Sequence, residues 1–289
     1  MSKKIRKAVI PVAGLGTRFL PYTKAIPKEM LPIIDVPSIH IIIEEALAAG
    51  IDSVLFVTTR EKHSLQDYFD KHHQLENIIE KEDKKELREQ LDRIPHNFKI
   101  YSVRQIEARG LGDAIYHAKD YINPDEHFAV FLPDDLIISK VPVMKQMVKV
   151  YDEFKRTVVA VERVPKNKVS SYGIIKAKKI RERIYAAEDM QEKPPLKEAF
   201  SNLGIVGRYI LPGTIFENIA KTKPGVKGEI QITDAIKMLT PGVIGYEFEG
   251  LRCDTGNKFG YIQTVLRYAA MDKNMKGDLK KEVKKLFNL

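Results

Sequence analysis

The chain has 289 residues, of which 44% are hydrophobic and 30% are charged, so it can bury a large core without disulfides or structural metals. Its single cysteine, Cys253, has no partner for a disulfide, and no signal-peptide pattern or apolar run of about 18 residues is present. We therefore expect a cytoplasmic protein without a membrane span. The formal net charge of +9 suits nucleic acid or small anionic substrates, but part of it lies in two terminal basic segments, 3–7 and 273–285, which we expect to be solvated.

The first half of the chain alternates between predicted strands and helices. An apolar, β-branched run predicts a buried strand over 7–12, and a helical pattern of apolar residues follows Pro37 and ends near Gly50. The same alternation continues with a strand over 53–58, a helix over 62–71, a strand over 98–103, a helix over 113–121 and a strand over 127–132. This order predicts an α/β fold with a mostly parallel, Rossmann-like sheet flanked by helices.

Two other regions have different patterns. Residues 76–91 are nearly all charged, with opposite signs three and four apart, and predict one exposed helix without chemistry. The second half predicts strands over 157–161, 172–176 and 203–210 and helices over 212–220 and 229–239, which we interpret as α+β additions to the same sheet. No linker or repeat divides the chain, so we predict one domain over 1–289. Its basic C-terminal helix, within 272–289, is expected to pack on the core or on another subunit rather than on a membrane.

A glycine-rich turn, residues 13–18, follows the first predicted strand. Its glycines, Gly14 and Gly16, allow the backbone to approach phosphate groups and present N–H donors to them. The turn is not a dinucleotide fingerprint, because bulky Phe19 stands where a third small residue is needed, and it is not a Walker A loop, because no lysine follows Gly16. A tight strand-to-helix connection explains the glycines equally well.

A second irregular segment, residues 24–32, contains two lysines and two prolines that hold it extended. Its Lys28 could face the same polyphosphate as Arg18. Solvated surface is the alternative for any two basic residues, but the density of turn residues here favours a fixed geometry.

These two segments, Ala-Gly-Leu-Gly-Thr-Arg and Lys-Ala-Ile-Pro-Lys-Glu-Met-Leu-Pro, resemble the signature of bacterial UTP–glucose-1-phosphate uridylyltransferases. Further matches occur in order along residues 5–270: 109–112, 132–135, 171–175, 192–194, 207–209, 228–234 and 254–256. The resemblance implies the nucleotide-diphospho-sugar transferase fold. It also implies that glucose 1-phosphate attacks the α-phosphorus of UTP and releases pyrophosphate. A dimer or tetramer is expected.

The nucleotide-binding residues implied by the resemblance lie in three segments. They are Ala13, Gly14, Gly16, Thr17, Gln105 and Gly110. Gln105 and Gly110 follow the strand over 98–103, and so lie at the carboxyl edge of the predicted sheet, where ligands of open α/β folds bind. A Gln amide can pair with a pyrimidine edge, and the matching residues of similar enzymes contact the base. A surface turn is the local alternative.

Two aspartates are the candidate ligands of a Mg²⁺ cofactor. Asp134 follows the strand over 127–132 and offers the hard oxygen that Mg²⁺ prefers. The resemblance supplies Asp254 as the second ligand, although an Asp before Thr-Gly is also an ordinary turn or cap. Asp135 is either a neighbour mistaken for a ligand or a supporting residue, and we choose Asp134.

The sugar-phosphate side of the site is implied by the resemblance alone, since Glu192-Lys193-Pro194 otherwise indicates an exposed charged turn. In similar enzymes the Glu binds sugar hydroxyls, the Lys holds the phosphate, and the backbone at Gly173 lies beside the hexose. A nearby acidic segment fits a helix N-terminus and is assigned no chemistry; it contains Glu229, Gln231 and Asp234.

The catalytic set is therefore Arg18, Lys28, Lys193 and Asp134. Because the substrate supplies the nucleophile, these groups act by positioning and charge neutralisation. Three residues beside the nucleotide site depart from the usual pattern: Tyr22, Arg109 and Asp113. These positions bear on which base and which sugar the enzyme accepts. The alternatives are an enzyme that uses dTTP, CTP or another hexose phosphate, a catalytically silent binding protein, and a nucleic-acid-binding protein. The last lacks an aromatic-studded basic face, so no nucleic-acid partner is expected.

Overall fold

The computed structural model describes residues 4–225 and 228–288, and the structural statements below concern these residues. The strands are β1 Lys7–Pro11, β2 Pro32–Ile33, β3 Val36–Pro37, β4 Ser53–Thr58, β5 Lys99–Arg104, β6 His127–Phe131, β7 Asp135–Ile138, β8 Thr157–Arg163, β9 Gly173–Arg181, β10 Ile184–Glu192, β11 Leu203–Pro212, β12 Val243–Glu247 and β13 Leu251–Asp254. The α-helices are α1 Ser38–Ala48, α2 Ser64–Asp67, α3 His73–Lys81, α4 Lys85–Asp92, α5 Leu111–Tyr116, α6 Val143–Phe154, α7 Ile215–Lys221, α8 Ile232–Lys237, α9 Lys258–Met271 and α10 Lys276–Phe287. The 3₁₀-helices are η1 Thr17–Phe19, η2 Tyr22–Lys24, η3 Lys28–Met30 and η4 Lys166–Ser171.

The largest sheet in the described part of the chain has nine strands, in the order β5-β4-β1-β6-β11-β8-β12-β10-β9. The strands β5, β4, β1 and β6 are parallel, as the alternating pattern of the first half predicts. From β6 onward the pairs are antiparallel, except for the parallel pair β8 and β12. The predicted α/β class with α+β additions is confirmed, and parallel pairing is concentrated in the first half.

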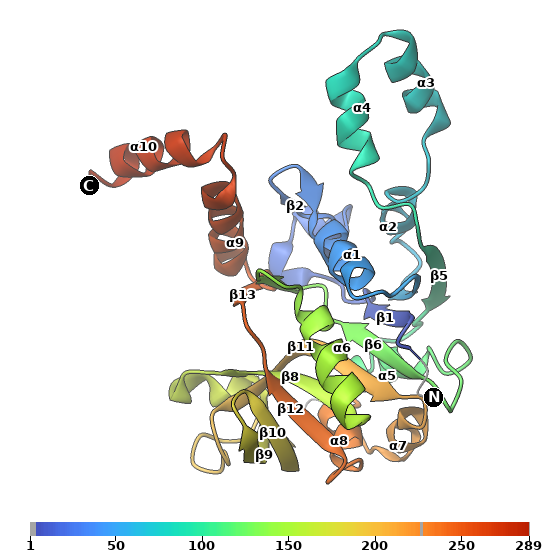
Figure 1. Ribbon diagram of the computed structural model, residues 1–289, viewed down its shortest axis with the longest axis vertical. Helices are drawn as coiled ribbons and strands as arrows, with labels where there is room; N and C mark the ends of the chain where they lie inside the picture. Colours follow the sequence, from blue (N-terminus) through green and yellow to red (C-terminus); the bar gives the residue numbers. More distant parts are fainter. Residues whose placement is uncertain (1–3, 226–227, 289) are drawn as a thin grey trace.

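Helices cover both faces of this sheet (Figure 1). Successive residues of β1 point to opposite faces, so Ala8 and Ile10 pack with α1 and α6 while Val9 packs with α5, α7 and α8. Burial on both faces explains why the central residues of β1 and β4 are consecutive apolar residues.

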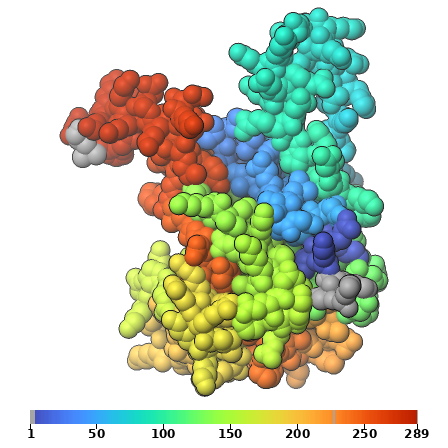
Figure 2. All heavy atoms as spheres, in the orientation of Figure 1, coloured from blue at the N-terminus to red at the C-terminus, as the bar shows by residue number. Residues whose placement is uncertain are grey.

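Two helical units project from this body (Figures 1 and 2). The first corrects a prediction: the charged segment 76–91 is not one helix but a hairpin of α3 and α4. Asp83, with φ of 48°, takes a left-handed conformation between them. The two helices contact each other, and Ile79 of α3 is buried.

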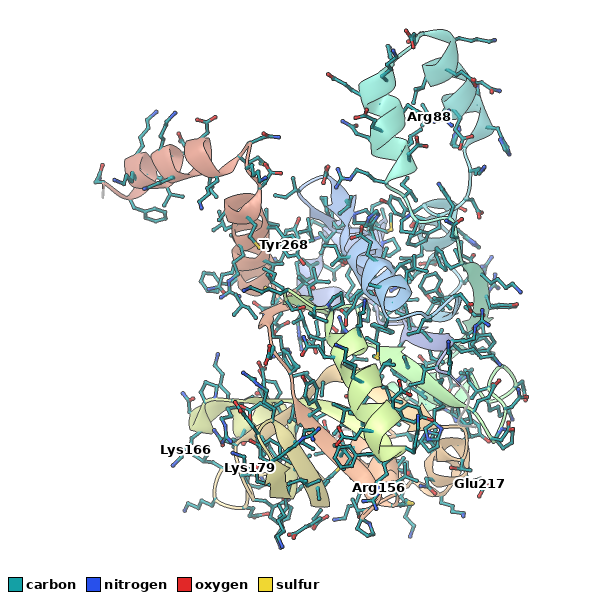
Figure 3. The ribbon with its side chains drawn as sticks, viewed as in Figure 1. Arg88, Arg156, Lys166, Lys179, Glu217 and Tyr268 are labelled. Carbon is teal, nitrogen blue, oxygen red and sulfur yellow. The ribbon has the colours of Figure 1, made fainter. Side chains whose placement is uncertain are left out.

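The second projecting unit consists of α9 and α10. The predicted basic C-terminal helix is confirmed as α10, although residue 289 lies outside the described part. Tyr268 of α9 packs against the main core (Figure 3). In contrast, no described residue of α10 is buried, so this helix contacts α9 rather than the core. None of the described helices combines the length and apolar character needed to cross a bilayer.

Candidate active site

The glycine turn and the Asp134 turn meet at one edge of the sheet. The strands β1 and β6 are parallel neighbours, so the segments that follow their carboxyl ends lie side by side. Across this edge Lys28 Nζ lies 3.0 Å from Asp134 Oδ2. Burial, the largest single influence, opposes ionisation of Asp134, but the charge and hydrogen bond of Lys28, together with a backbone hydrogen bond and the charge of Arg252, hold the pKa of the carboxyl below its ordinary value.

The glycine turn packs directly against the segment that carries Lys28. Gly16 has φ of 65°, which favours glycine, and a Cβ there would lie 3.0 Å from Thr23 Cγ2 and 3.2 Å from Lys28 Cβ. Thr23 Oγ1 donates to the Gly16 carbonyl at 2.8 Å. The turn leads into the 3₁₀-helix η1, from which Arg18 Nη1 donates to the Gly256 carbonyl at 3.1 Å. Arg18 and Lys28 therefore lie at one site and are not separate surface cations.

A small antiparallel ladder brings the two predicted metal ligands together. The strands β7 and β13 pair so that Asp254 lies opposite Asp135. Thr255 N and Thr255 Oγ1 donate to the Asp134 carbonyl at 2.8 Å and 3.0 Å. A Cβ placed on Gly256 would lie 2.9 Å from Asp254 Oδ1 and 3.3 Å from Asp134 Oδ2, so both carboxylates reach the same point in space.

This donor set fits Mg²⁺, which commonly binds one or two carboxylates together with substrate phosphates. Across the described ranges, no group of three His, Cys, Asp or Glu side chains is placed to hold a metal. The candidate metal ligands in the described part of the chain are therefore the two carboxylates Asp134 and Asp254.

Asp135 has a different environment from Asp134. Its Oδ2 accepts the Gly207 N–H at 2.9 Å and its Oδ1 accepts Arg252 Nε at 2.6 Å. The Arg252 guanidinium also lies over the Tyr172 ring and donates to Glu162. With both oxygens bonded within the protein, Asp135 supports the turn, which is one of the two roles considered from the sequence.

The predicted sugar-phosphate residues lie where β9 and β10 pair, because Gly173 is the register partner of Glu192. Glu192 Oε1 lies 2.9 Å from Lys193 Nζ, and its Oε2 accepts Thr233 Oγ1 at 2.7 Å. Lys193 takes φ of 45°, and its N–H donates to the Tyr172 carbonyl at 2.9 Å. A Cβ on Gly173 would lie 2.8 Å from Thr233 Oγ1, so only glycine leaves this pair in place.

One cavity of about 340 Å³ connects these groups. The predicted site residues that line it are Arg18, Asp134, Gly173, Glu192, Lys193 and Asp254. Lys28 reaches it through its ion pair with Asp134. The fold therefore brings these predicted residues, which are far apart in the sequence, to the walls of one cavity.

Gln105 and Gly110 are held by contacts within the protein and do not line that cavity. Gln105 is only 5% exposed, and its Nε2 donates to Asp113 Oδ2 at 2.6 Å. Gly110 has φ of 104°, and a Cβ there would meet Glu229 Cβ at 2.8 Å. Close backbone packing therefore accounts for this glycine, and its predicted contact with a base stays a prediction.

Several residues at the cavity were not assigned a role from the sequence. Glu229 and Gln231 line it, although they were interpreted as part of a helix N-terminus, and α8 begins later, at Ile232. Thr233 and Arg252 line it too. The position of Thr233 within the matched segment 228–234 was the available signal, but its partner Glu192 is 41 residues away and only the fold shows the contact.

Comparison with known proteins places the chain in a family. The sequence profile described as Nucleotidyl transferase matches residues 7–270. The chain belongs to the nucleotidyl transferase family. Within this family it is 44% identical to UTP–glucose-1-phosphate uridylyltransferase 2 of Staphylococcus saprophyticus, over 98% of this chain and 99% of the relative.

Solved structures of nucleotidyl transferases agree with this assignment. A UDP-glucose pyrophosphorylase complexed with UDP-glucose has a TM-score of 0.83 and 43% identity, and the match covers 93% of this chain and all of the other. A UTP-bound enzyme of the same name from Acinetobacter baumannii has a TM-score of 0.89 and 38% identity, with 98% and 99% of the chains covered. The resemblance inferred from the motifs is confirmed.

Proposed function

We propose that this chain is a UTP–glucose-1-phosphate uridylyltransferase, which forms UDP-glucose and releases pyrophosphate. The observation that carries the proposal is the gathering of Arg18, Lys28 and Lys193 around the paired carboxylates Asp134 and Asp254. The substrates are supported by the names of relatives at 44% identity and by similar structures that contain UTP or UDP-glucose. A thymidylyltransferase structure is only 20% identical and so supports the fold alone.

The chemistry requires two anions to approach each other. A phosphate oxygen of glucose 1-phosphate forms a bond to the α-phosphorus of UTP, and the bond from that phosphorus to the pyrophosphate oxygen breaks. Because the phosphates repel, the protein must supply positive charge and fixed positions on both sides of the reacting centre. Lys193 would neutralise the sugar phosphate, while Arg18 and Lys28 would face the triphosphate.

The remaining side chains would hold the non-reacting parts of the substrates. Glu192 is fixed by Thr233 and could accept hydrogen bonds from sugar hydroxyls, with the Gly173 backbone beside the ring. The backbone of residues 13–17 would cradle the triphosphate, and Gln105 would pair with the base. Bound Mg²⁺, held by Asp134 and Asp254, would neutralise phosphate charge during transfer and on the leaving pyrophosphate.

Three broader predictions go with this function. We expect the enzyme to act in the cytoplasm as a single-domain subunit over residues 1–289, which include the undescribed 1–3, 226–227 and 289. We also expect a dimer or tetramer. Exposed apolar side chains on α9 support assembly; they are Phe259, Ile262 and Leu266.

A pyrophosphate-release assay tests the proposal. With glucose 1-phosphate, wild-type protein should turn over UTP at least about tenfold more efficiently than dTTP, and a chelator of divalent ions should stop the reaction. Asp134→Asn should lower kcat by about 10²-fold or more, because it removes charge from the proposed metal site. Asp152→Asn, at an exposed aspartate of α6, is the matched control and should leave kcat unchanged. Equal rates for Asp134→Asn and wild type would refute the assigned role.

A further inference from the structure

A buried lysine outside the assigned site connects two of the loops proposed to face the triphosphate, the glycine turn and the segment that carries Lys28. Lys62 follows β4, is 8% exposed, and donates from Nζ to the Gly14 carbonyl and to Glu29 Oε2, both at 2.8 Å. Gly14 belongs to the glycine turn and Glu29 immediately follows Lys28. One ammonium group therefore links the glycine turn, residues 13–18, to the segment that carries Lys28.

The bond to Gly14 fixes the direction of the next backbone donor. In a trans peptide the C=O and N–H point in opposite directions, so a Gly14 carbonyl held by Lys62 turns the Leu15 N–H away from the buried ammonium. Leu15 is 70% exposed, which places this peptide at the surface of the turn. Lys62 thus determines which side of the turn presents its N–H group.

The bond to Glu29 fixes the neighbouring cation. Glu29 is 1% exposed and lies in η3 next to Lys28, while its backbone carbonyl accepts Ser38 Oγ at 2.9 Å. Within the described part of the chain, Glu29 Oε1 has no hydrogen-bond partner. Lys62 is therefore the cation that directly compensates this buried carboxylate.

Such a pair is an inefficient way to gain stability. Both groups lose water on burial, and a buried ion pair often stabilises no better than apolar side chains of similar volume. Burial lowers the pKa of Lys62, and Glu29 only partly opposes that effect. The gain is instead geometric, since the pair holds two irregular loops at a defined separation.

We propose that Lys62 is a positioning residue for nucleotidyl transfer, which sets the distance and orientation between the glycine turn and Lys28 for an incoming nucleoside triphosphate. This inference rests on the proposed function. Lys62 acts through Gly14 and Glu29 and needs no contact with substrate.

The test compares two double variants that each remove one lysine–glutamate pair. Glu29→Gln/Lys62→Met removes both buried charges together, so that no unpaired charge remains to unfold the protein. Lys7→Met/Glu126→Gln is the matched control, because Lys7 Nζ likewise donates to one carbonyl, of Tyr121, and to one carboxylate, of Glu126. The control pair lies at the amino end of β1, opposite the site.

We expect the Lys62 double variant to lower kcat/KM for UTP by about 10- to 100-fold, as the loss of hydrogen bonds to a charged group predicts. The KM for glucose 1-phosphate should change by less than about threefold, because Lys193 and Glu192 are untouched. The control should keep both constants. If the KM values for UTP and glucose 1-phosphate changed equally, Lys62 would serve only folding. Equal losses of kcat/KM for UTP in the two double variants would lead to the same conclusion.

Hydrogen exchange of the ligand-free protein provides a readout that does not depend on activity. Backbone amides of residues 13–18 should exchange faster in the Lys62 double variant and not in the control. Unchanged exchange there would overturn the inference. Failure of the proposed function would appear separately, as a wild-type protein that releases no pyrophosphate from UTP and glucose 1-phosphate.

Discussion

The buried ion pair of Arg208 and Glu45 allows a quantitative prediction of stability, because it holds the backbone that carries Asp134. Arg208 is fully buried, and its Nε and Nη2 donate to the two Glu45 oxygens at 3.0 Å and 2.8 Å. The same guanidinium donates to the carbonyls of Leu132, Gly207 and Asp135. It therefore holds the backbone on both sides of Asp134.

Arg208→Met should lower the free energy of unfolding by about 3–5 kcal/mol, the usual loss when one partner of a buried pair is removed. It leaves the Glu45 carboxylate with the Met144 N–H, at 3.0 Å, and leaves three carbonyls without this donor. Glu45→Gln should cost a similar amount. The double variant Arg208→Met/Glu45→Gln leaves no unpaired charge. Its loss of unfolding free energy should therefore be smaller than the sum of the two single losses by at least about 2 kcal/mol.

Urea unfolding followed by circular dichroism measures these values, provided that the denaturant slopes agree among the variants. At a temperature where all variants are folded, Arg208→Met should also reduce kcat about tenfold, which corresponds to about 1.4 kcal/mol at the transition state. A loss below about 1 kcal/mol in unfolding, or strictly additive single losses, would refute the reasoning.

Two further predictions concern the sugar side and pH. Gly173→Ala places a Cβ 2.8 Å from Thr233 Oγ1 and 3.1 Å from Glu192 Oε2, so it should raise the KM for glucose 1-phosphate at least about fivefold and leave the KM for UTP unchanged in steady-state kinetics. Burial, and then the charge of Lys155, lower the pKa of His127 below 6.5, so the unfolded state binds its proton first and stability should fall as pH drops below 6.5. Melting temperatures near pH 7 and pH 5.5 should differ less in His127→Gln, and an equal difference would contradict this assignment.

Local sequence patterns predicted the parallel half of the sheet well. The strand over 53–58 has the predicted bounds, and β1, β5 and β6 begin or end within a residue of theirs. The strands β1, β4 and β6 are short, mostly apolar runs, whereas β5 alternates polar and apolar residues. Both patterns depend mainly on neighbouring residues. The glycine turn and Lys28 were identified in the same way, from turn chemistry within a few positions.

Patterns failed where a segment depends on a distant partner. The short strands β7 and β13 were not predicted, because each is stabilised by the other across more than 100 residues. The split of the charged segment into α3 and α4 follows from packing of one helix on the other, which charge spacing does not reveal.

The sequence by itself determined the family and the α/β class, and it predicted the candidate cations and carboxylates of the site. Only the tertiary structure decided that Asp254 lies beside Asp134, that Thr233 holds Glu192, and that Lys62 links the two loops. The physical reason is the separation of the partners along the chain. Apolar periodicity and turn residues act over a few positions, whereas these contacts join groups more than 30 residues apart and form only when the strands have assembled into the sheet.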